Sequence, residues 1–308
     1  MLESLVQELV HLSLELHGQQ TNYPNPTIIT LCLVHMIPQG TESVQERTNI
    51  HLSSEMDRRN MRIGAFGDLH GDRYMEFLIP SLEDLAAVDL LLLAGDISDR
   101  GNLEPFRSTV ALLKEHTDAP VIAVFGNEEY QQDHERYRRE LPGSFLDDGS
   151  TTFELEGMLV RVVGTRGSLD RPTWWQRNNV PGIWRSYGER VERISELLRR
   201  GEEDLLILLS HYSPTRATLE GEDPGRYEEM GSRAMEGVLE LRRPDLVIHG
   251  HAHGGSREGT IGGGQTSLED FGSERRAVPV FNVALPLARE ITILDVRRDV
   301  DGFHITRV

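Results

Sequence analysis

The sequence predicts an α/β protein in which buried strands alternate with helices. Residues 88–94 and 120–125 are short and almost continuously apolar, which is typical of strands covered on both faces. Residues 103–115, between them, carry apolar side chains at helical spacing. A strand–helix–strand order of this kind implies parallel strands joined by right-handed crossovers. We find no internal repeat.

The remaining elements of the first half follow the same rhythm. Residues 62–66 predict the first strand, and residues 74–85 predict a helix with its apolar side chains on one side. Residues 151–156 and 158–163, separated by Gly157, predict a β-hairpin.

The second half predicts two further helix–strand pairs. Residues 188–200 and 230–242 have the pattern of amphipathic helices, and residues 204–209 and 245–248 that of buried strands. Residues 254–276 are polar and rich in glycine, so we expect a mobile loop without regular structure. Closing strands are expected at residues 278–283, 289–296 and 302–306.

Composition limits the class of protein. The 308 residues, 38% hydrophobic and 27% charged, suffice for one large domain with an appendage. The single cysteine, Cys32, excludes an internal disulfide framework and a cysteine-based zinc cluster. A net charge of -18 and a pI near 5.1 disfavour a nucleic-acid polymer as partner.

The longest early apolar run, residues 27–37, is too short to span a membrane and lacks the features of a signal peptide. We therefore expect a cytoplasmic protein without a membrane partner, and leave its oligomeric state open.

Residues 1–60 differ from the rest of the chain. Residues 2–16 have leucines at helical spacing, and a polar stretch, a short apolar run and a polar segment follow. Such a segment is either a regulatory or dimerising element or a loosely packed extension. It has too little apolar surface for a core of its own, so we favour the extension and place the main domain at residues 61–308.

Side chains of metal-ligand type follow five of the strand-like runs. The carboxyl ends of parallel strands meet at one edge of a sheet, so these side chains are expected to converge. Residues two apart on an extended segment point the same way. Asp68 and His70 are therefore expected to lie side by side, and so are His251 and His253. Carboxylate and amide oxygens mixed with imidazoles suit divalent cations such as Mn²⁺, Fe²⁺ or Zn²⁺, and the set is too large for one tetrahedral site. The candidates are Asp68, His70, Asp96, Asn127, His211, His251 and His253.

These blocks, in this order, resemble the calcineurin-like metallophosphoesterases, whose pattern reads Asp-x-His, Gly-Asp, Gly-Asn-His-(Asp/Glu), His and Gly-His-x-His. The likeness runs from Gly67 to His253. It implies two mixed β-sheets sandwiched between helices, a four-layer α/β/β/α fold. It also implies two metal ions, one held by Asp68, His70 and His253, the other by Asn127, His211 and His251, with Asp96 as the bridge.

The activity that the resemblance implies is metal-dependent hydrolysis of a phosphoester. A hydroxide shared by two cations would attack phosphorus in line, because each cation lowers the pKa of bound water. Asp96 is then catalytic as the bridging ligand. As substrate we expect a small phosphodiester or phosphomonoester rather than a protein or polymer.

Glu128 departs from the family pattern, which usually has histidine after Gly-Asn. That histidine helps to protonate the leaving oxygen or stabilises the transition state. A glutamate beside two cations would be ionised and therefore a poor general acid. Three alternatives follow: another group protonates the leaving oxygen, the leaving group needs little help, or Glu128 only orients a ligand or an arginine.

Two arginines are candidate substrate ligands. Asp99-Arg100-Gly101 resembles the block with which phosphoprotein phosphatases and dinucleoside tetraphosphate hydrolases grip phosphate, although an Asp–Arg turn ahead of a helix explains it equally well. Arg166 is the second candidate, and a structural role is favoured for it. A phosphoprotein phosphatase is therefore the first alternative function. A non-catalytic metal-binding scaffold, in which Glu128 marks lost catalysis, is the second.

Three tryptophans lie in one stretch that also carries arginine and asparagine. Trp174, Trp175 and Trp184 could form a substrate lid or a base-stacking platform. The favoured interpretation is a hydrophobic patch that anchors this stretch on the core.

Overall fold

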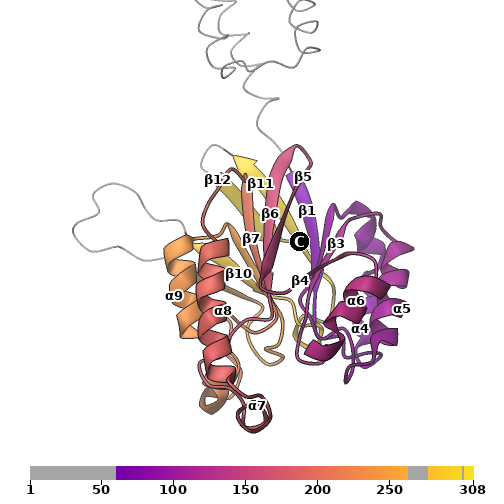
Figure 1. Ribbon diagram of the computed structural model, residues 1–308. Coiled ribbons are helices and arrows are strands. Elements are labelled where there is room, and N and C mark those ends of the chain that lie inside the picture. The colour runs from indigo at the N-terminus through magenta and orange to yellow at the C-terminus, as the bar shows by residue number, and fades with distance from the viewer. Residues whose placement is uncertain (1–59, 263–276, 300–301) are drawn as a thin grey trace, which may run out of the picture. The chain divides into compact units, whose positions relative to one another are not determined.

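Two six-stranded sheets lie face to face in the computed structural model, which describes residues 60–262, 277–299 and 302–308 (Figure 1). The order across the first sheet is β12 (Gly302–Arg307), β11 (Thr292–Asp299), β1 (Asn60–Phe66), β2 (Leu90–Leu93), β3 (Val121–Val124) and β4 (Ser144–Leu146). The order across the second is β5 (Gly149–Leu155), β6 (Met158–Thr165), β7 (Leu205–Ser210), β8 (Leu246–His249), β10 (Val278–Asn282) and β9 (Glu258–Ile261).

The centre of each sheet is parallel. Strands β1, β2, β3 and β4 run the same way, as do β6, β7, β8 and β10, whereas β11, β12, β5 and β9 pair antiparallel with their neighbours. The predicted parallel start of the chain and the β5–β6 hairpin are both confirmed. The parallel strands of both sheets finish at the lower end of Figure 1.

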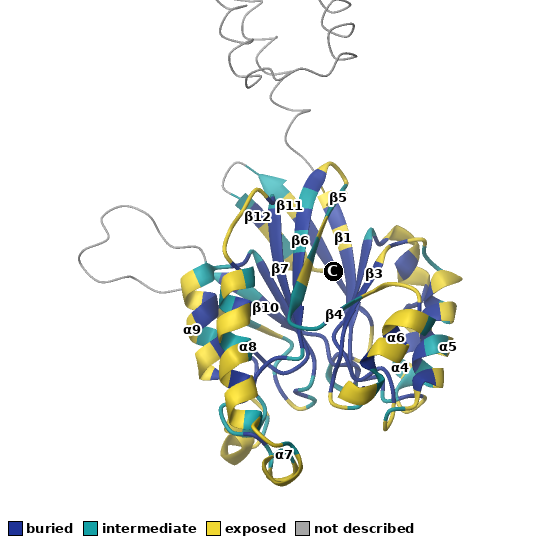
Figure 2. Cartoon of the chain, viewed as in Figure 1, coloured by how far each residue is buried: buried dark blue, intermediate teal, exposed yellow. Residues whose placement is uncertain are grey.

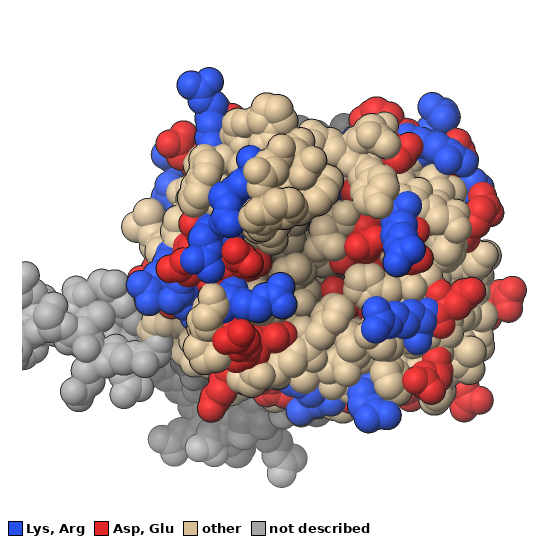
Figure 3. Space-filling model, turned by 90° about the horizontal axis from the view of Figure 1, so that it is seen from below, with Lys and Arg blue, Asp and Glu red and all other residues tan. Residues whose placement is uncertain are grey.

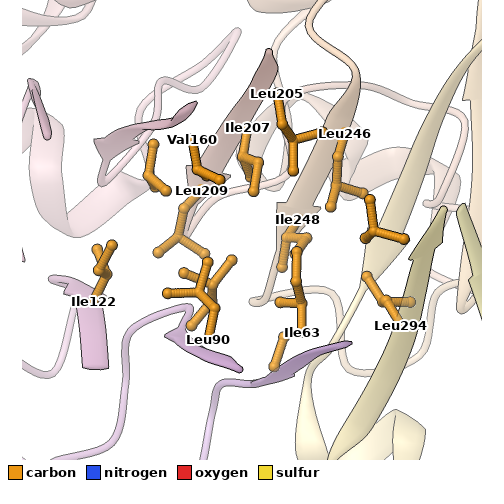
Figure 4. Packing of buried hydrophobic residues seen from close by; sticks show 14 of the residues in the cluster. Ile63, Leu90, Ile122, Val160, Leu205, Ile207, Leu209, Leu246, Ile248 and Leu294 are labelled. Carbon is orange, nitrogen blue, oxygen red and sulfur yellow. The ribbon is translucent and has the colours of Figure 1, made fainter. Parts of the chain in front are cut away.

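The main core lies between the sheets. In β2, Leu90 and Leu92 point into this core, while Leu91 and Leu93 belong to the core on the outer face. Strand β7 divides its side chains between two cores in the same way. Figure 4 shows such residues of both sheets meeting. Because strand side chains alternate with period two, burial on both faces explains why these runs are apolar throughout.

Helices cover the outer face of each sheet, which completes the four layers. Apolar residues of α4 (Met75–Leu78), α5 (Leu103–Lys114) and α6 (His134–Glu140) lie in the core on the first sheet. Those of α8 (Ile183–Leu197) and α9 (Arg233–Arg242) lie in the core on the second. Their outer sides are exposed (Figure 2). The short elements are α7 (Trp174–Asn179), α10 (Leu285–Ala288), and the 3-10 turns η1 (Ile79–Ser81), η2 (Glu83–Ala87), η3 (Gln131–Asp133) and η4 (Pro224–Glu229).

Several predicted elements need correction. The helix predicted at 74–85 is one α-helical turn, α4, followed by η1 and η2, and Pro80 lacks the N–H that a continuous helix needs there. The loop predicted at 254–276 contains β9, which pairs with β10, while residues 263–276 are outside the described residues. Helix α8 begins five residues before the predicted 188. Elements α6, β4 and α7 were not predicted.

The predicted extension, residues 1–60, lies outside the described residues apart from Asn60, the first residue of β1. None of the helices described is both long and apolar enough to cross a membrane.

Candidate metal centre

The seven predicted ligands all follow strands, at the same end of the two sheets. Asp68 and His70 follow β1, Asp96 follows β2, and Asn127 follows β3. The second sheet supplies His211 after β7, and His251 and His253 after β8. Figure 3 views the molecule from this end, where the surface is hollowed near its centre with acidic and basic side chains around the hollow.

One cluster joins ligands of both sheets around Asp68. His253 Nε2 lies 3.0 Å from Asp68 Oδ1. His70 Nε2 lies 3.9 Å from Asp68 Oδ1 and 3.9 Å from Asp96 Oδ2. Ligand atoms of Asp68, His70 and His253 all lie within 4.8 Å of one another, so these three side chains could hold one cation.

A second cluster includes His211, whose ligand atom lies within 4.8 Å of those of Asp68 and Asp96. His211 Nε2 is 3.1 Å from Asn127 Oδ1 and 3.6 Å from Asp96 Oδ2. The His251 ring lies beside this pair, its centroid 5.0 Å from that of His211. The backbone N–H of His251 donates to Asp68 Oδ2 at 2.8 Å, which connects the two clusters. Asp96 Oδ2 therefore faces both His70 and His211.

The donor set fits a divalent cation. His70 Nε2 is buried without a hydrogen-bond partner, and it faces the carboxylates of Asp68 and Asp96. A buried polar atom in this condition is unfavourable, and a cation bound by imidazole and carboxylate would satisfy it. Imidazole, carboxylate and amide together match the ligand preferences of Mn²⁺, Fe²⁺ and Zn²⁺.

Burial keeps His211 and His251 in the form that binds metal. It lowers the pKa of His211 to about 4 and the pKa of His251 well below its usual 6.5. Both rings are therefore neutral at pH 7 and offer a lone pair. Burial alone would raise the pKa of Asp68, but the hydrogen bond from His253 and the charges of His211 and His253 lower it to about 2. Asp68 is thus an anionic ligand at any physiological pH.

Asp96 is in the opposite situation, because it shares its surroundings with another buried carboxylate. Burial, and next the charge of Glu129, raise the pKa of Asp96 well above its usual value. Glu129 is fully buried and accepts the backbone N–H groups of Asp96 at 2.9 Å, Ser98 at 2.8 Å and Gly126 at 2.7 Å. It therefore ties the loop after β2 to the loop after β3. Our sequence analysis assigned Glu129 no role, although it occupies the Asp/Glu position of the family pattern.

The backbone at the centre is strained. Asp68, His70, Asp96 and His251 have φ between 50° and 69°, a conformation uncommon for residues other than glycine. Strain of this kind clusters at functional sites, where the surrounding structure enforces it. A Cβ at Gly126 would lie 2.1 Å from Asp96 Oδ1, which explains the glycine before Asn127.

A comparison with protein families identifies the family of this chain. Residues 61–255 match the calcineurin-like phosphoesterases. The chain belongs to this family. The resemblance that the ligand pattern predicted is confirmed. The predicted four-layer fold is confirmed as well.

Two solved structures are similar to this chain at low sequence identity. The phosphopantetheinyl hydrolase of Mycobacterium tuberculosis is 16% identical with a TM-score of 0.50, over 73% of this chain and 89% of that one. The protein TT1561 of Thermus thermophilus is 17% identical with a TM-score of 0.45, over 80% of this chain and 98% of that one. A search of the curated proteins found no match.

Glu128, where this chain departs from the family pattern, links the centre to the Arg100 loop. Its backbone N–H donates to Asp96 Oδ1 at 2.7 Å. Its Oε2 accepts the backbone N–H of Arg100 at 2.7 Å, and its carbonyl accepts that of Gly101 at 2.8 Å. A carboxylate oxygen of Glu128 also lies within 4.8 Å of ligand atoms of His70 and Asp96. The side chain thus lies at the centre and also orients Arg100.

The two predicted substrate arginines lie in different surroundings. Arg100 is exposed and has a φ of 49°. Arg166 is half-buried, its Nη2 donates to the Glu129 carbonyl at 2.8 Å, and the same Nη2 lies 3.0 Å from His134 Nε2. These contacts support the backbone of the β3 loop. A substrate contact stays a prediction for both arginines.

A further arginine near the centre was missed by the sequence analysis. The Arg73 guanidinium lies 5.2 Å from the centroid of the Tyr74 ring, which is itself 6.2 Å from that of His70. Arg73 is exposed and brings positive charge to the first cluster. Its only signal in the sequence is its position three residues after a ligand.

Proposed function

We propose that this phosphoesterase hydrolyses a small phosphodiester or phosphomonoester with two divalent cations, Mn²⁺, Fe²⁺ or Zn²⁺. The proposal is carried by one observation. The buried, unpartnered His70 Nε2 faces Asp68 and Asp96, while Asp96 Oδ2 also faces His211. A carboxylate oxygen placed between two ligand clusters has the position that a bridging ligand requires.

The side chains around Asp96 determine which of its oxygens is available. Oδ1 is held by the backbone N–H of Glu128, so Oδ2 remains to contact both clusters. Glu129 keeps the backbone of Asp96 and Gly126 in place. When bound, the cations would supply a hydroxide nucleophile and positive charge for the phosphate oxygens. Arg100, whose backbone N–H is held by Glu128, is proposed to add a guanidinium to the same phosphate.

Glu128 is assigned an orienting role. An ionised carboxylate accepts hydrogen bonds and cannot protonate a leaving oxygen. Its Oε2 already accepts the Arg100 N–H, which makes it an anchor for the arginine loop. We therefore expect good leaving groups to react faster than poor ones by a wide margin.

The test is turnover of bis(4-nitrophenyl) phosphate beside 4-nitrophenyl phosphate, with Mn²⁺ and after chelation. We expect metal-dependent release of nitrophenol that chelation abolishes and added Mn²⁺ restores. Turnover that survives complete chelation would refute the metal mechanism. Full metal loading without turnover of either compound would favour the non-catalytic scaffold.

A phosphoprotein phosphatase is the second candidate, and the exposure of Arg100 is the observation that favours it. An exposed arginine at the rim could grip a phosphate carried on a bulky protein. Hydrolysis of a phosphoserine peptide at a kcat/KM above that of 4-nitrophenyl phosphate would select this candidate. A lower value would select the small-molecule activity.

A further inference from the structure

The three tryptophans of the chain are exposed at the end of the molecule that carries the candidate metal centre. Trp174 is 69% exposed, Trp175 60% and Trp184 58%. The interpretation that they anchor their stretch on the core is therefore wrong. Tryptophan is enriched where proteins bind partners and ligands, so these exposed side chains are candidate binding residues. We call these three side chains the tryptophan surface.

Helix α7, which carries two of the three, is held rigidly for a helix of six residues. Thr173 and Gln176 form a reciprocal capping box at its start. Arg177 Nη1 donates to the Pro172 carbonyl at 2.7 Å. At its end the amides of Asn178 and Asn179 donate to the carbonyls of the two tryptophans at 2.7 and 2.8 Å. These bonds fix the backbone that carries the two tryptophans, which reduces the entropy that binding costs.

Helix α7 is also connected directly to the centre. Gln176 Nε2 donates to the Tyr212 hydroxyl at 3.1 Å. Tyr212 follows the predicted ligand His211, and its ring centroid is 4.7 Å from that of His251. The helix projects at the lower end of Figure 1, where the parallel strands finish. Trp175 is the neighbour of Gln176, about 100° around the helix from it.

We infer that the tryptophan surface binds a planar aromatic group of the substrate, such as a nucleobase, while the phosphate lies at the candidate metal centre. This inference rests on the proposed function. An indole face stacks on any π-ring with little dependence on its identity, so the surface would select aromatic phosphoesters as a class. The net charge of -18 disfavours an anionic membrane or a nucleic-acid polymer as the occupant.

The first experiment measures ring binding without catalysis. Adenosine is titrated into the metal-free full-length protein while tryptophan fluorescence is recorded. All the tryptophans of the chain belong to this surface, so the signal has no other source. We expect saturable quenching by adenosine and none by ribose. The affinity should fall about tenfold in Trp175→Ala and far less in Trp175→Phe, which keeps a ring. Leu241→Ala, which removes a 68% exposed apolar side chain on α9, should change nothing.

The second experiment compares adenosine 5′-phosphate with ribose 5-phosphate in the metal-loaded enzyme. Ribose 5-phosphate has the same phosphate ester but a hydroxyl in place of the base. We expect the ratio of their kcat/KM values to favour the nucleotide, and to fall about tenfold in Trp175→Ala but not in Leu241→Ala. An equal kcat/KM for both compounds in the wild type would overturn the inference.

The two experiments separate this inference from the proposed function. If neither phosphoester is hydrolysed yet adenosine quenches, the proposed function fails and ring binding stands. If hydrolysis is normal yet adenosine leaves the fluorescence unchanged, the inference fails alone. A blue shift on adding phosphatidylglycerol vesicles, or on raising the protein concentration, without a response to adenosine would assign the surface to a membrane or to a second copy of the chain.

Discussion

Asp96 has two oxygens in different surroundings, and this difference organises the candidate centre. Oδ1 accepts the Glu128 N–H at 2.7 Å, and Oδ2 faces His70 at 3.9 Å and His211 at 3.6 Å. Burial beside Glu129 raises the pKa of Asp96, so bound cations would stabilise the carboxylate that the protein alone disfavours. Metal binding and the ionisation of Asp96 are therefore coupled.

Replacing Asp96 by asparagine should abolish metal-dependent turnover with little loss of fold. The amide keeps an oxygen for the Glu128 N–H but lacks the charge for bridging two cations. We expect the bound metal, measured by elemental analysis, to fall by at least one ion per chain, with an unchanged far-UV circular dichroism spectrum. Wild-type turnover at unchanged metal content would refute the bridging assignment.

Glu128→His should raise the rate for poor leaving groups more than for good ones. The imidazole restores the proton donor that the family usually has after Gly-Asn, and protonation matters most where the leaving oxygen is basic. A series of aryl phosphoesters of increasing leaving-group pKa measures the slope.

The matched control for that series is Glu128→Gln. This variant keeps an oxygen that can accept the Arg100 N–H but offers no acid. Its slope should stay at the wild-type value. A histidine variant that shifts all rates equally, or that loses metal, would show that Glu128 acts only through the Arg100 loop or as a ligand.

Helix α6 shows how an element outside the centre supports it. His134, its first residue, stacks on Phe125 with ring centroids 3.6 Å apart, and its Nδ1 lies 3.0 Å from Asp147 Oδ2. A carboxylate can only accept, so the His134 Nδ1 donates to Asp147, while its Nε2 lies 3.2 Å from the Glu129 carbonyl and 3.0 Å from Arg166 Nη2. This network joins α6 and the turn after β4 to Arg166, which supports the Glu129 carbonyl.

Asp147→Asn should lower the free energy of unfolding by about 1–2 kcal/mol, the usual cost of weakening a charge-assisted hydrogen bond. Burial alone would raise the pKa of Asp147, but the hydrogen bond from His134 lowers it below its usual 3.8. The stabilisation is therefore complete above about pH 4 and is lost as the pH falls further. Urea titrations from pH 6 down to pH 2.5 should show the variant losing less stability than the wild type below pH 4. Parallel curves for the two proteins would contradict the assignment.

At the scale of the whole molecule, the centre exists because two sheets finish at the same end. The first sheet contributes Asp68, His70, Asp96 and Asn127, and the second the three remaining histidines. The core between the sheets fixes their distance, because apolar side chains of both faces interlock there (Figure 4). Loss of packing in that core would separate the ligands even if each loop kept its conformation.

Removal of residues 1–60 should leave activity and thermal stability nearly unchanged. Every predicted ligand lies beyond residue 60, and of the β1 ladder with β11 only the Asn60–Arg297 pair is lost. The melting temperature and the kcat/KM for bis(4-nitrophenyl) phosphate, compared with those of the full chain, provide the measurement. An insoluble or inactive shortened protein would show that the extension completes the core or the centre.

The sequence by itself determined the positions of most strands and which side chains are candidate ligands. Both are local signals: an apolar run buried on two faces, and a polar side chain directly after it.

The tertiary structure decided what depends on distant contacts. Strand β9 forms because β10 offers it an edge, Glu129 is buried because two loops close around it, and Arg166 is engaged because His134 lies beside it. The exposure of the three tryptophans was decided in the same way, because at the start of α8 it is Ile183 and Tyr187 that pack in a small core, and the tryptophans do not. Whether a side chain is buried depends on which surfaces the fold brings together, and a local sequence pattern does not contain that information.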